Sequence, residues 1–377
     1  MTANAVPLRP TYCDVDLAAI AGNVASIQAH VGTAEVMPVI KADAYGHGLL
    51  AVGTYLESQG VASLGVAYVE EGVALRDAGV TATIHVLGGA VAEQIEAFVD
   101  HDLDVTVPSL DKLHEVAEVG RRRGTTPRVH LKIDTGMERI GVHHYNAERF
   151  LLEAAQTDLV EVSSVFSHFA NADVADLDHA KLQLERFLDA VATYERHGLV
   201  TPRLHMANSG AIEQLPESHL DLVRPGILVF GVRPDAEVTP SIDVTPALSW
   251  KSRVIYFKVV EAGAPVGYGS TWAPTEQTRV ITLPVGYGDG YRRSGSNSAD
   301  VVVRGRLHRV VGRVCMDQTM VDIGWGTAYN GDEVVLIGKA ENGAVVSAED
   351  LALACDTIPY EILTGITARV PRRYLNG

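Results

Sequence analysis

Basic residues are scarce in this chain. It contains 31 Lys and Arg against 47 Asp and Glu in 377 residues, which gives a formal net charge of -16 at pH 7. Nucleic acids and anionic membranes bind through basic patches, so this balance argues against both as partners. No apolar run approaches the roughly 20 residues that a membrane-spanning helix needs. The acidic excess mainly favours solubility.

The chain also contains few cysteines. The three cysteines lie far apart and show no CxxC spacing: Cys13, Cys315 and Cys355. This pattern indicates neither a disulfide framework nor a zinc site, and we expect no bound metal. The first ten residues lack a basic segment followed by an apolar one, so we expect no secretory signal. Reduced thiols without a signal predict a cytoplasmic protein.

The length exceeds that at which a single core usually stops growing, which predicts two domains. Residues 36–231 alternate short apolar runs with helical patterns such as Val91–Asp100, Asp111–Arg123 and Leu177–His197. Eight such units in a row predict an α/β fold, a closed (β/α)8 barrel of the TIM type. An open doubly wound sheet is the alternative, but no G-x-G-x-x-G follows the first strand. The expected strands are Val36–Asp43, Ser63–Tyr68, Thr83–Gly89, Asp104–Ser109, Arg128–Gly136, Glu161–Phe169, Arg203–Ser209 and Leu222–Gly231.

The pattern changes after the Pro- and Asp-rich segment Val232–Ala247. Short β-branched runs separated by glycines then predict a second, mostly-β domain with one late helix, Ser347–Cys355. We expect the barrel at residues 12–240 and the β-rich domain at 241–377. Thr11–Asp16 also has strand character and could belong to either domain. The expected strands of the second domain are Leu248–Glu261, Thr278–Pro284, Asp300–Val303, Leu307–Val314, Met320–Ile323 and Glu333–Ile337.

The segment VMPVIKADAYGHG at residues 36–48 carries one lysine, Lys41, at the end of an apolar run. Burial disfavours the ammonium form and lowers its pKa, which is the condition for a lysine that holds a carbonyl compound as a Schiff base. Gly46 and Gly48 would let backbone amides approach an anionic ligand, and Tyr45 adds a hydroxyl donor. The alternative is that Lys41 only leaves a strand end and the glycines only make a turn. This segment alone leaves both readings open.

Other expected strands also end in polar residues. The active site of a (β/α)8 barrel lies at the C-terminal ends of its strands. One polar residue there is unremarkable, but five strands that end this way indicate a site; the alternative is that these residues merely face solvent. The residues are Lys41, Asp134–Arg139, His168, His205, Asn208–Ser209 and Arg224–Gly226.

Taken together, these stretches resemble the alanine racemases, pyridoxal-phosphate enzymes of the fold-type III group. The resemblance runs in order from about residue 12 to 374, and the lysine and Met-Asp-Gln motifs together are highly specific. It implies a (β/α)8 barrel that binds pyridoxal 5'-phosphate and a β-rich domain that supplies Tyr268 and Met316. The matching motifs are VIKADAYGHG from Val39, KIDTGMERIG from Lys132, SHFANAD from Ser167, ANS at 207–209, RPGI from Arg224, GYGSTW from Gly267, PVGYGDG from Pro284, GRVCMDQ from Gly312 and Tyr360.

The resemblance implies a two-base racemisation, because the Cα proton must leave one face and return on the other. Lys41 would serve the D face and Tyr268 the L face. A free tyrosine has a pKa near 10, so Tyr268 needs a partner; the resemblance supplies His168, which in turn meets Arg224. Arg224 would face the pyridine nitrogen, where its fixed charge disfavours ring protonation and suppresses transamination.

The remaining roles are implied in the same way. The cofactor would be bound by Lys41, Tyr45, Asn208, Ser209, Arg224, Gly226, Ile227 and Tyr360, and the substrate carboxylate by Arg139 and Met316. Lys132 would be carbamylated and orient Arg139, although it could also be an ordinary strand-end lysine. An entry corridor of Asp173, Tyr287, Arg293 and Tyr360 would suit alanine and reject bulky side chains.

The resemblance further implies a homodimer in which each site borrows Tyr268 from the partner. Interconversion of L-alanine and D-alanine would supply D-alanine for peptidoglycan. Four alternatives stay open: a serine or broad-specificity racemase, a fold-type III decarboxylase, a non-catalytic pyridoxal-phosphate-binding protein, and a metal-dependent hydrolase that uses His168, His205 and Asp134. Arg224 argues against the decarboxylase, since those enzymes pair the pyridine nitrogen with a carboxylate.

Overall fold

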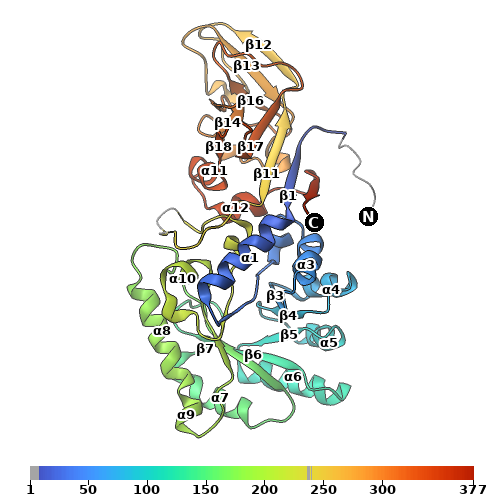
Figure 1. Cartoon of the computed structure of the whole chain (residues 1–377), viewed down its shortest axis with the longest axis vertical. Helices are drawn as coiled ribbons and strands as arrows, with labels where there is room; N and C mark the ends of the chain where they lie inside the picture. The colour runs from blue at the N-terminus through green and yellow to red at the C-terminus, as the bar shows by residue number, and fades with distance from the viewer. Residues whose placement is uncertain (1–7, 236–237, 239) are drawn as a thin grey trace.

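The computed structural model of the chain describes residues 8–235, 238 and 240–377. Helices surround a parallel sheet in the N-terminal part, and strands dominate the C-terminal part, which lies above it in Figure 1. This arrangement is the predicted one, a (β/α)8 barrel joined to a mostly-β unit.

The barrel sheet runs in the order β2-β10-β9-β8-β6-β5-β4-β3, and every neighbouring pair is parallel. A bridge between Val39 and Gly65 joins the two edges, with Ile40 N–H donating to the Gly65 carbonyl at 2.8 Å. The strands are β2 (Glu35–Val36), β3 (Ser63–Val66), β4 (Thr83–Val86), β5 (Asp104–Val107), β6 (Arg128–Asp134), β8 (Glu161–Phe166), β9 (Arg203–His205) and β10 (Leu222–Val223), with β7 (Val142–His143) paired to β6.

The helices around the barrel begin and end where local chemistry favours it. In α6, the Ser109 hydroxyl accepts from Lys112 N at 3.2 Å, and Gly124 ends the helix in the left-handed region. Such caps satisfy backbone groups that a helix end leaves unpaired. The helices are α1 (Leu17–Val31), α3 (Leu49–Ser58), α4 (Val69–Asp77), α5 (Ile95–Asp100), α6 (Leu110–Arg123), α7 (Ala147–Ala155), α8 (Asp178–Val191), α9 (Thr193–Arg196) and α10 (Ser209–Gln214). The short segment α2 (Lys41–Tyr45) is a left-handed turn.

The C-terminal unit takes one strand from the start of the chain. β1 (Tyr12–Asp16) pairs antiparallel with β11 (Leu248–Arg253) and parallel with β19 (Arg372–Leu375), so the segment Thr11–Asp16 lies in this sheet. The same sheet contains β14 (Asp300–Val303), β15 (Arg306–Arg309), β17 (Glu333–Lys339) and β18 (Val345–Val346). A second sheet holds β12 (Tyr256–Val260), β13 (Thr278–Leu283) and β16 (Thr319–Asp322), and two helices follow, α11 (Ala348–Ala354) and α12 (Pro359–Thr364).

Several expected elements are shorter or divided. The expected strand Val36–Asp43 is wrong beyond Val36, because residues 42–45 fold as a left-handed turn. Leu222–Gly231 is a strand only to Val223, and Ile227–Phe230 forms a 3-10 helix, η4. Leu248–Glu261 divides into β11 and β12, and Leu177–His197 into α8 and α9.

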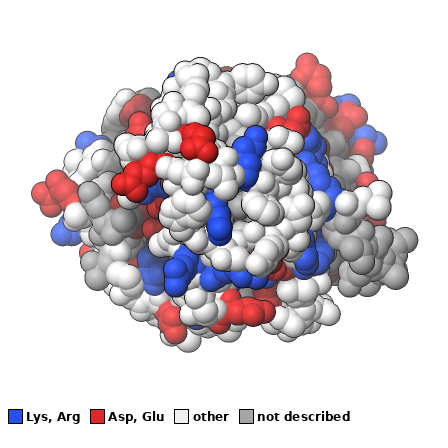
Figure 2. All heavy atoms as spheres, turned by 90° about the horizontal axis from the view of Figure 1, so that it is seen from above, with Lys and Arg blue, Asp and Glu red and all other residues white. Residues whose placement is uncertain are grey.

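The two units share one apolar core. A single cluster of buried side chains includes Ile133 and Phe150 of the barrel together with Trp250 and Leu336 of the C-terminal sheet. On the surface, seen from the C-terminal unit, Lys and Arg side chains form a band across the face although the chain as a whole is acidic (Figure 2). The acidic excess is therefore not evenly spread.

Candidate active site

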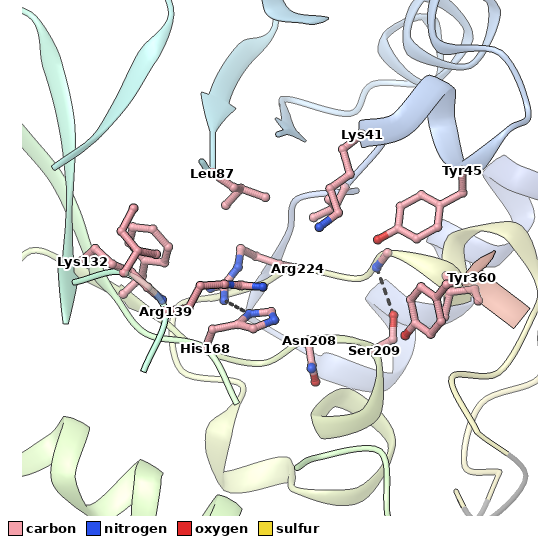
Figure 3. A pocket seen from close by; sticks show the side chains of 15 residues that line it. Lys41, Tyr45, Leu87, Lys132, Arg139, His168, Asn208, Ser209, Arg224 and Tyr360 are labelled. Atoms are coloured by element: carbon pink, nitrogen blue, oxygen red, sulfur yellow. Dashed lines mark hydrogen bonds between the residues drawn. The ribbon is translucent and has the colours of Figure 1, made fainter. Parts of the chain in front are cut away.

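A pocket opens at the C-terminal ends of the barrel strands, where barrels of this class carry their active sites. It has a volume of about 770 Å³, part of which is open to solvent. Figure 3 shows Lys41 pointing into it, with Tyr45, Ser209 and Tyr360 to one side and Lys132 and Arg139 to the other. The predicted residues that line the pocket are Lys41, Tyr45, Lys132, Arg139, His168, Asn208, Ser209, Arg224, Gly226, Ile227 and Tyr360.

Lys41 opens a left-handed turn rather than ending a strand. The next four residues, none of them glycine, have φ between 52° and 55°: Ala42, Asp43, Ala44 and Tyr45. Each left-handed non-glycine residue costs roughly 1–2 kcal/mol, so the turn needs outside support. The Glu71 carboxylate provides it by accepting from Ala42 N at 2.6 Å, and Asp43 Oδ1 accepts from Leu49 N at 2.8 Å.

The surroundings of the Lys41 amine stabilise its charged form only weakly. Burial lowers the pKa of Lys41 from its ordinary value, and the positive charges of Arg139 and Arg224 lower it further, while Glu71 acts in the opposite direction. No ion pair involves Lys41 in the described part of the chain. A lowered pKa favours the neutral amine, the form in which a lysine directed into a pocket is a nucleophile.

Gly46 and Gly48 serve the turn in a way that the sequence did not predict. A Cβ on Gly46 would come within 2.3 Å of the Leu363 carbonyl oxygen, and one on Gly48 within 1.9 Å of the Tyr374 hydroxyl. Arg372 Nε also donates to the Gly46 carbonyl at 2.9 Å. Neither glycine lines the pocket, so the expectation that they admit an anionic ligand is replaced by close packing against the C-terminal unit.

One end of the pocket gathers hydroxyl groups. Ser209 Oγ accepts from Gly226 N at 3.0 Å, and a Cβ on Gly226 would come within 2.3 Å of the Tyr45 hydroxyl. The rings of Tyr45 and Tyr360 lie 6.0 Å apart. Burial raises the pKa of both tyrosines, so both hydroxyls keep their protons and can donate. Clustered neutral donors suit a phosphate dianion.

Arg224 occupies the centre of the pocket floor and is only 3% exposed. Its guanidinium donates to the Ser167 and Met206 carbonyls at 2.8 and 3.1 Å. It also donates to His168 Nδ1 at 3.2 Å, shown in Figure 3, and to His205 Nδ1. Burial lowers the pKa of Arg224 to about 9, so the group stays charged at neutral pH. Every acceptor it meets is uncharged.

The opposite end of the pocket holds two basic residues. Lys132 is buried with Nζ 4.4 Å from the Phe166 ring centroid, and burial together with Arg224 and Arg139 lowers its pKa well below the ordinary value. Arg139 lies exposed at the mouth. Asp134 shapes the loop that carries it, because its carboxylate accepts from the amides of residues 136–139 at 2.8–3.2 Å. Among the residues that the structure describes, none of those that line the pocket is acidic.

Five predicted residues do not line this pocket: Asp173, Tyr268, Tyr287, Arg293 and Met316. Tyr268 begins a short 3-10 helix, Tyr268–Ser270, and is 73% exposed; Met316 is 52% exposed. Gly288 N donates to the Met316 carbonyl at 2.9 Å, which holds the loop of Tyr287 against Met316. Asp173 lies near enough to Tyr360 for its charge to raise the pKa of that hydroxyl.

Four lining residues are apolar and were not predicted: Val39, Leu87, Ile140 and Phe166. Leu87 and Phe166 lie at the ends of strands, so their position could have indicated the pocket, but nothing in their apolar side chains points to a functional role. Two residues of the metal-dependent hydrolase alternative already have other hydrogen-bond partners: the Asp134 carboxylate accepts from backbone amides, and His205 accepts from Arg224. Within the described residues, only His85, His130 and His205 have nitrogens close enough to share a metal ion.

A lysine whose lowered pKa favours the neutral amine can bond an aldehyde covalently, while the nearby hydroxyls can bind a phosphate. The short approach between Gly226 and the Tyr45 hydroxyl leaves no room for a larger side chain at that end. These residues fit pyridoxal phosphate, and the chain is therefore of the class of barrel-type pyridoxal-phosphate enzymes.

Comparison with known proteins narrows the class. Residues 15–234 match the family model "Alanine racemase, N-terminal domain" and residues 247–374 match "Alanine racemase, C-terminal domain". Alanine racemase 2 of Caldanaerobacter subterraneus is 41% identical over 371 residues, 98% of this chain and 95% of the relative. The alanine racemase of Symbiobacterium thermophilum is 43% identical, covering 97% of each chain.

Solved structures agree. The alanine racemase of a D-cycloserine-producing Streptomyces lavendulae matches with a TM-score of 0.92 and 37% identity over 98% of both chains. That of Bartonella henselae, which has covalently bound pyridoxal phosphate, matches with a TM-score of 0.88 and 26% identity over 97% of this chain and 99% of its own. The chain belongs to the alanine racemase family.

Proposed function

We propose that this chain interconverts L-alanine and D-alanine with pyridoxal phosphate held by Lys41, and that Lys41 and Tyr268 are its two acid/base groups. Membership of the family makes it an alanine racemase, an isomerase that depends on this cofactor. The observation that carries the residue assignment is the Lys41 amine, which has a lowered pKa and no ion-pair partner among the described residues and lies in a pocket that also holds Arg224.

The cofactor would be held at two places by residues of the barrel. Lys41 Nζ would bond it covalently, and the hydroxyls of Tyr45, Ser209 and Tyr360 would donate to its phosphate, supported by the backbone of Gly226 and Ile227 and by Asn208. When bound, pyridoxal phosphate delocalises the negative charge that develops at the substrate Cα. Arg224 would face its ring nitrogen and keep it unprotonated, since the guanidinium is a donor only and remains charged.

Each proton transfer then needs a base on its own face of the substrate. Lys41 Nζ, set free when the substrate amine takes its place, would remove or return the Cα proton of D-alanine, for which its lowered pKa suits it. The Tyr268 hydroxyl would do so for L-alanine. His168 supports this role: its Nδ1 accepts from Arg224, which leaves the proton on Nε2 available to donate to a tyrosine oxygen.

The substrate carboxylate would be bound by Arg139 and the backbone of Met316. The Arg139 guanidinium makes no ion pair with any described residue, so it is free for an incoming carboxylate. Asp173, Tyr287, Arg293 and Tyr360 would line the entry and limit it to small side chains. We assign residues 12–240 to the cofactor-binding domain, apart from β1 (Tyr12–Asp16), which pairs within the C-terminal sheet, and 241–377 to the domain that supplies Tyr268 and Met316.

A homodimer would complete the site. Tyr268 and Met316 are exposed and lie outside the pocket of their own chain, so a second copy has to deliver them if they act. Strand β12 adds exposed apolar side chains, with Tyr256 at 56%, Phe257 at 46% and Val259 at 49%, and such patches mark protein interfaces.

We further propose that the product D-alanine supplies peptidoglycan synthesis and that the enzyme works in the cytoplasm. The acidic charge supports the absence of nucleic-acid partners. No helix in the described part of the chain has both the length and the apolar character to cross a membrane.

The function is tested by incubating the purified protein and cofactor with L-alanine in D₂O. We expect deuterium at Cα and loss of optical rotation, and borohydride reduction followed by peptide mapping should locate the cofactor on Lys41. Exchange at serine faster than at alanine would favour a broad-specificity racemase. Absence of exchange despite bound cofactor would contradict the proposal, as would a cofactor attached to a different lysine.

Carbamylation of Lys132 is a separate prediction. Its lowered pKa favours the neutral amine, which is the form that reacts with carbon dioxide, and the resulting anion would attract the Arg139 guanidinium. With ¹³C-bicarbonate we expect a carbamate signal by NMR that disappears in Lys132→Arg. Lys112→Arg is the matched control, because Lys112 is largely covered but already paired with Glu115. A signal that survives in Lys132→Arg would contradict this assignment.

A further inference from the structure

A chain of buried hydrogen bonds runs through the barrel beneath the pocket and ends at Arg224. It starts at Asp104, the first residue of β5, whose Oδ2 meets His130 Nε2 at 2.9 Å. His130 Nδ1 meets Ser164 Oγ at 2.5 Å, and Ser164 Oγ meets His205 Nε2 at 2.8 Å. His205 Nδ1 meets Arg224. The chain thus links the N-terminal end of the barrel to the catalytic end.

The hydrogen bonds of this series can be donated in only one direction. Arginine has no acceptor, so Arg224 donates to His205 Nδ1, and the proton of a neutral His205 is on Nε2. Nε2 then donates to Ser164, whose own hydroxyl hydrogen is left for His130 Nδ1. His130 therefore also carries its proton on Nε2 and donates to Asp104. Burial lowers the pKa of both histidines, so both are neutral and every donor points from Arg224 toward the carboxylate.

Asp104 is the charged end of the chain. It is 1% exposed, and its Oδ1 accepts from Arg128 Nε at 2.6 Å. Burial alone would raise the pKa of Asp104, but the hydrogen bond from His130 and the charge of Arg128 outweigh it and hold the pKa below its ordinary value. Arg224 itself has no carboxylate within ion-pair distance among the described residues. Asp104 is the carboxylate to which its hydrogen bonds lead.

We propose that Asp104 is a positioning residue for Arg224, acting through His130, Ser164 and His205 to fix the orientation of the guanidinium at the cofactor ring. The inference rests on the proposed function, since it takes Arg224 to be the group that faces the ring nitrogen. Each hydrogen bond in this series fixes the direction of the next one. Without an anion at Asp104, the proton of His130 is no longer held on Nε2. Ser164 and His205 are then free to reorient. Arg224 then loses its hydrogen bond to His205, the side-chain acceptor through which it is linked to Asp104.

A metal site is the competing reading of the same histidines, since the nitrogens of His85, His130 and His205 lie within 4.8 Å of one another. The rings of His85 and His130 are stacked, with centroids 3.7 Å apart and an interplanar angle of 11°. Lone pairs lie in the ring planes, so two parallel rings do not direct them at one ion. His85 Nε2 is also bonded to Thr106 Oγ1 at 2.9 Å. The hydrogen-bonded chain is the reading that the geometry favours.

The experiment compares three variants of the holoenzyme. Asp104→Asn removes the terminal charge, and Ser164→Ala breaks the chain in its middle without changing charge. Asp14→Asn is the matched control: Asp14 is 9% exposed and pairs with Arg373 at 2.6 Å, but in the C-terminal sheet. We expect the first two to lose roughly 10- to 100-fold in kcat, as when a group that orients a catalytic residue is removed. In the same two variants, the amount of pyruvate released per racemisation should rise, because a displaced Arg224 no longer suppresses transamination.

The direct readout is ¹⁵N NMR of histidine-labelled protein. We expect His130 and His205 in the neutral Nε2–H form in the unmodified enzyme, and a changed form for at least one of them in Ser164→Ala. An Nδ1–H or doubly protonated state in the unmodified enzyme, stoichiometric zinc, or Asp104→Asn and Ser164→Ala behaving like Asp14→Asn would each overturn the inference. The tautomers are measurable even in a protein without alanine racemase activity, so failure of the proposed function would be seen separately. If Asp104→Asn does not fold, the Ser164→Ala and tautomer results still decide.

Discussion

The barrel residues and the C-terminal residues of the candidate site differ in how firmly the chain holds them. Arg224 is 3% exposed and makes hydrogen bonds to four neighbouring residues, whereas Tyr268 is 73% exposed on a short 3-10 helix. Lys41 is fixed by a strained turn with contacts from both units, while Met316 is 52% exposed. The groups that would bind the cofactor are thus in place in one chain, and the groups that would act on the L face of the substrate are not.

This difference corresponds to two tasks of the pocket, binding the cofactor and acting on the substrate. A cofactor that stays bound benefits from rigid, desolvated partners, because their orientation is fixed before the ligand arrives. The exposed groups of the C-terminal unit gain their surroundings only when another surface covers them. Changes in the barrel should therefore affect both stability and activity, and changes at Tyr268 should affect activity alone.

The largest effect is expected for Tyr268→Phe. Loss of a general acid/base group costs about 10²–10⁴ in rate, so alanine racemisation should fall by that factor. Because Tyr268 is exposed, the free energy of unfolding and the cofactor absorbance should not change. Deuterium exchange should be lost first from L-alanine. Tyr329→Phe, also exposed at 56% in the C-terminal unit, is the control and should keep full activity.

Mixing inactive chains tests whether the exposed tyrosine acts in a partner. In hybrid dimers of Lys41→Ala and Tyr268→Phe chains, one of the two sites would receive both native residues, since the two groups come from different copies. Activity should then reappear on mixing. Two inactive chains that stay inactive after verified exchange of subunits would show that Tyr268 serves its own chain or none.

The next effect concerns His47 behind the Lys41 turn. Its Nδ1 donates to the Ala44 and Tyr45 carbonyls, its ring stacks on Phe230, and its buried Nε2 has no partner among the described residues. Burial lowers the pKa of His47 to about 4, from about 6.5 in the unfolded chain. Between these values the unfolded chain binds more protons, so the free energy of unfolding falls as the pH falls, by about 3 kcal/mol in total.

This contribution is measured by comparing the unmodified chain with His47→Asn, whose amide can donate to the same carbonyls. The difference between their unfolding free energies should shrink as the pH is lowered from neutral to about 4. The variant is needed because the buried histidines at other positions also have lowered pKa values and act in the same direction: His85, His130, His168 and His205. Parallel pH curves for the two proteins would contradict the assignment to His47.

A smaller effect is expected at Glu71, which supports the left-handed turn from α4. Its carboxylate accepts from Ala42 N at 2.6 Å and from Ala67 N at 2.8 Å. Loss of hydrogen bonds to a charged acceptor costs about 2 kcal/mol, so Glu71→Ala should lower the free energy of unfolding by about that amount and weaken cofactor binding. The exposed neighbour Glu70, changed to Ala, should do neither. Equal losses in both variants would mean that the turn does not depend on Glu71.

The sequence predicted the barrel because its strands and helices are short-range patterns that repeat along the chain. It did not predict the turn after Lys41, since Ala42 and Ala44 have no preference for positive φ and the supports at Glu71 and Arg372 are distant in sequence. The role of Gly46 was misread for the same reason, because the carbonyl that it accommodates belongs to Leu363.

The lining of the pocket was predicted where the residues are polar and overlooked where they are apolar. Lys41 and Arg224 stand out in the sequence because a charge that follows an apolar run needs an explanation, whereas Leu87 resembles any core leucine. The Asp104 chain could not be read from the sequence, since it depends on strand register: His130 pairs with Ser164 across β6 and β8. Nothing in the spacing of these residues reveals that register.

The pairing of β1 with β19 has a consequence for synthesis on the ribosome. Residues 12–16 must wait for residues 372–375, which follow every element of the barrel in the chain. The same late segment provides Arg372 and Tyr374, the contacts of Gly46 and Gly48. A nascent chain can therefore form its barrel strands early, but the turn that aims Lys41 is secured among the last events of maturation. Truncation before residue 372 would leave a lysine that is present but not positioned.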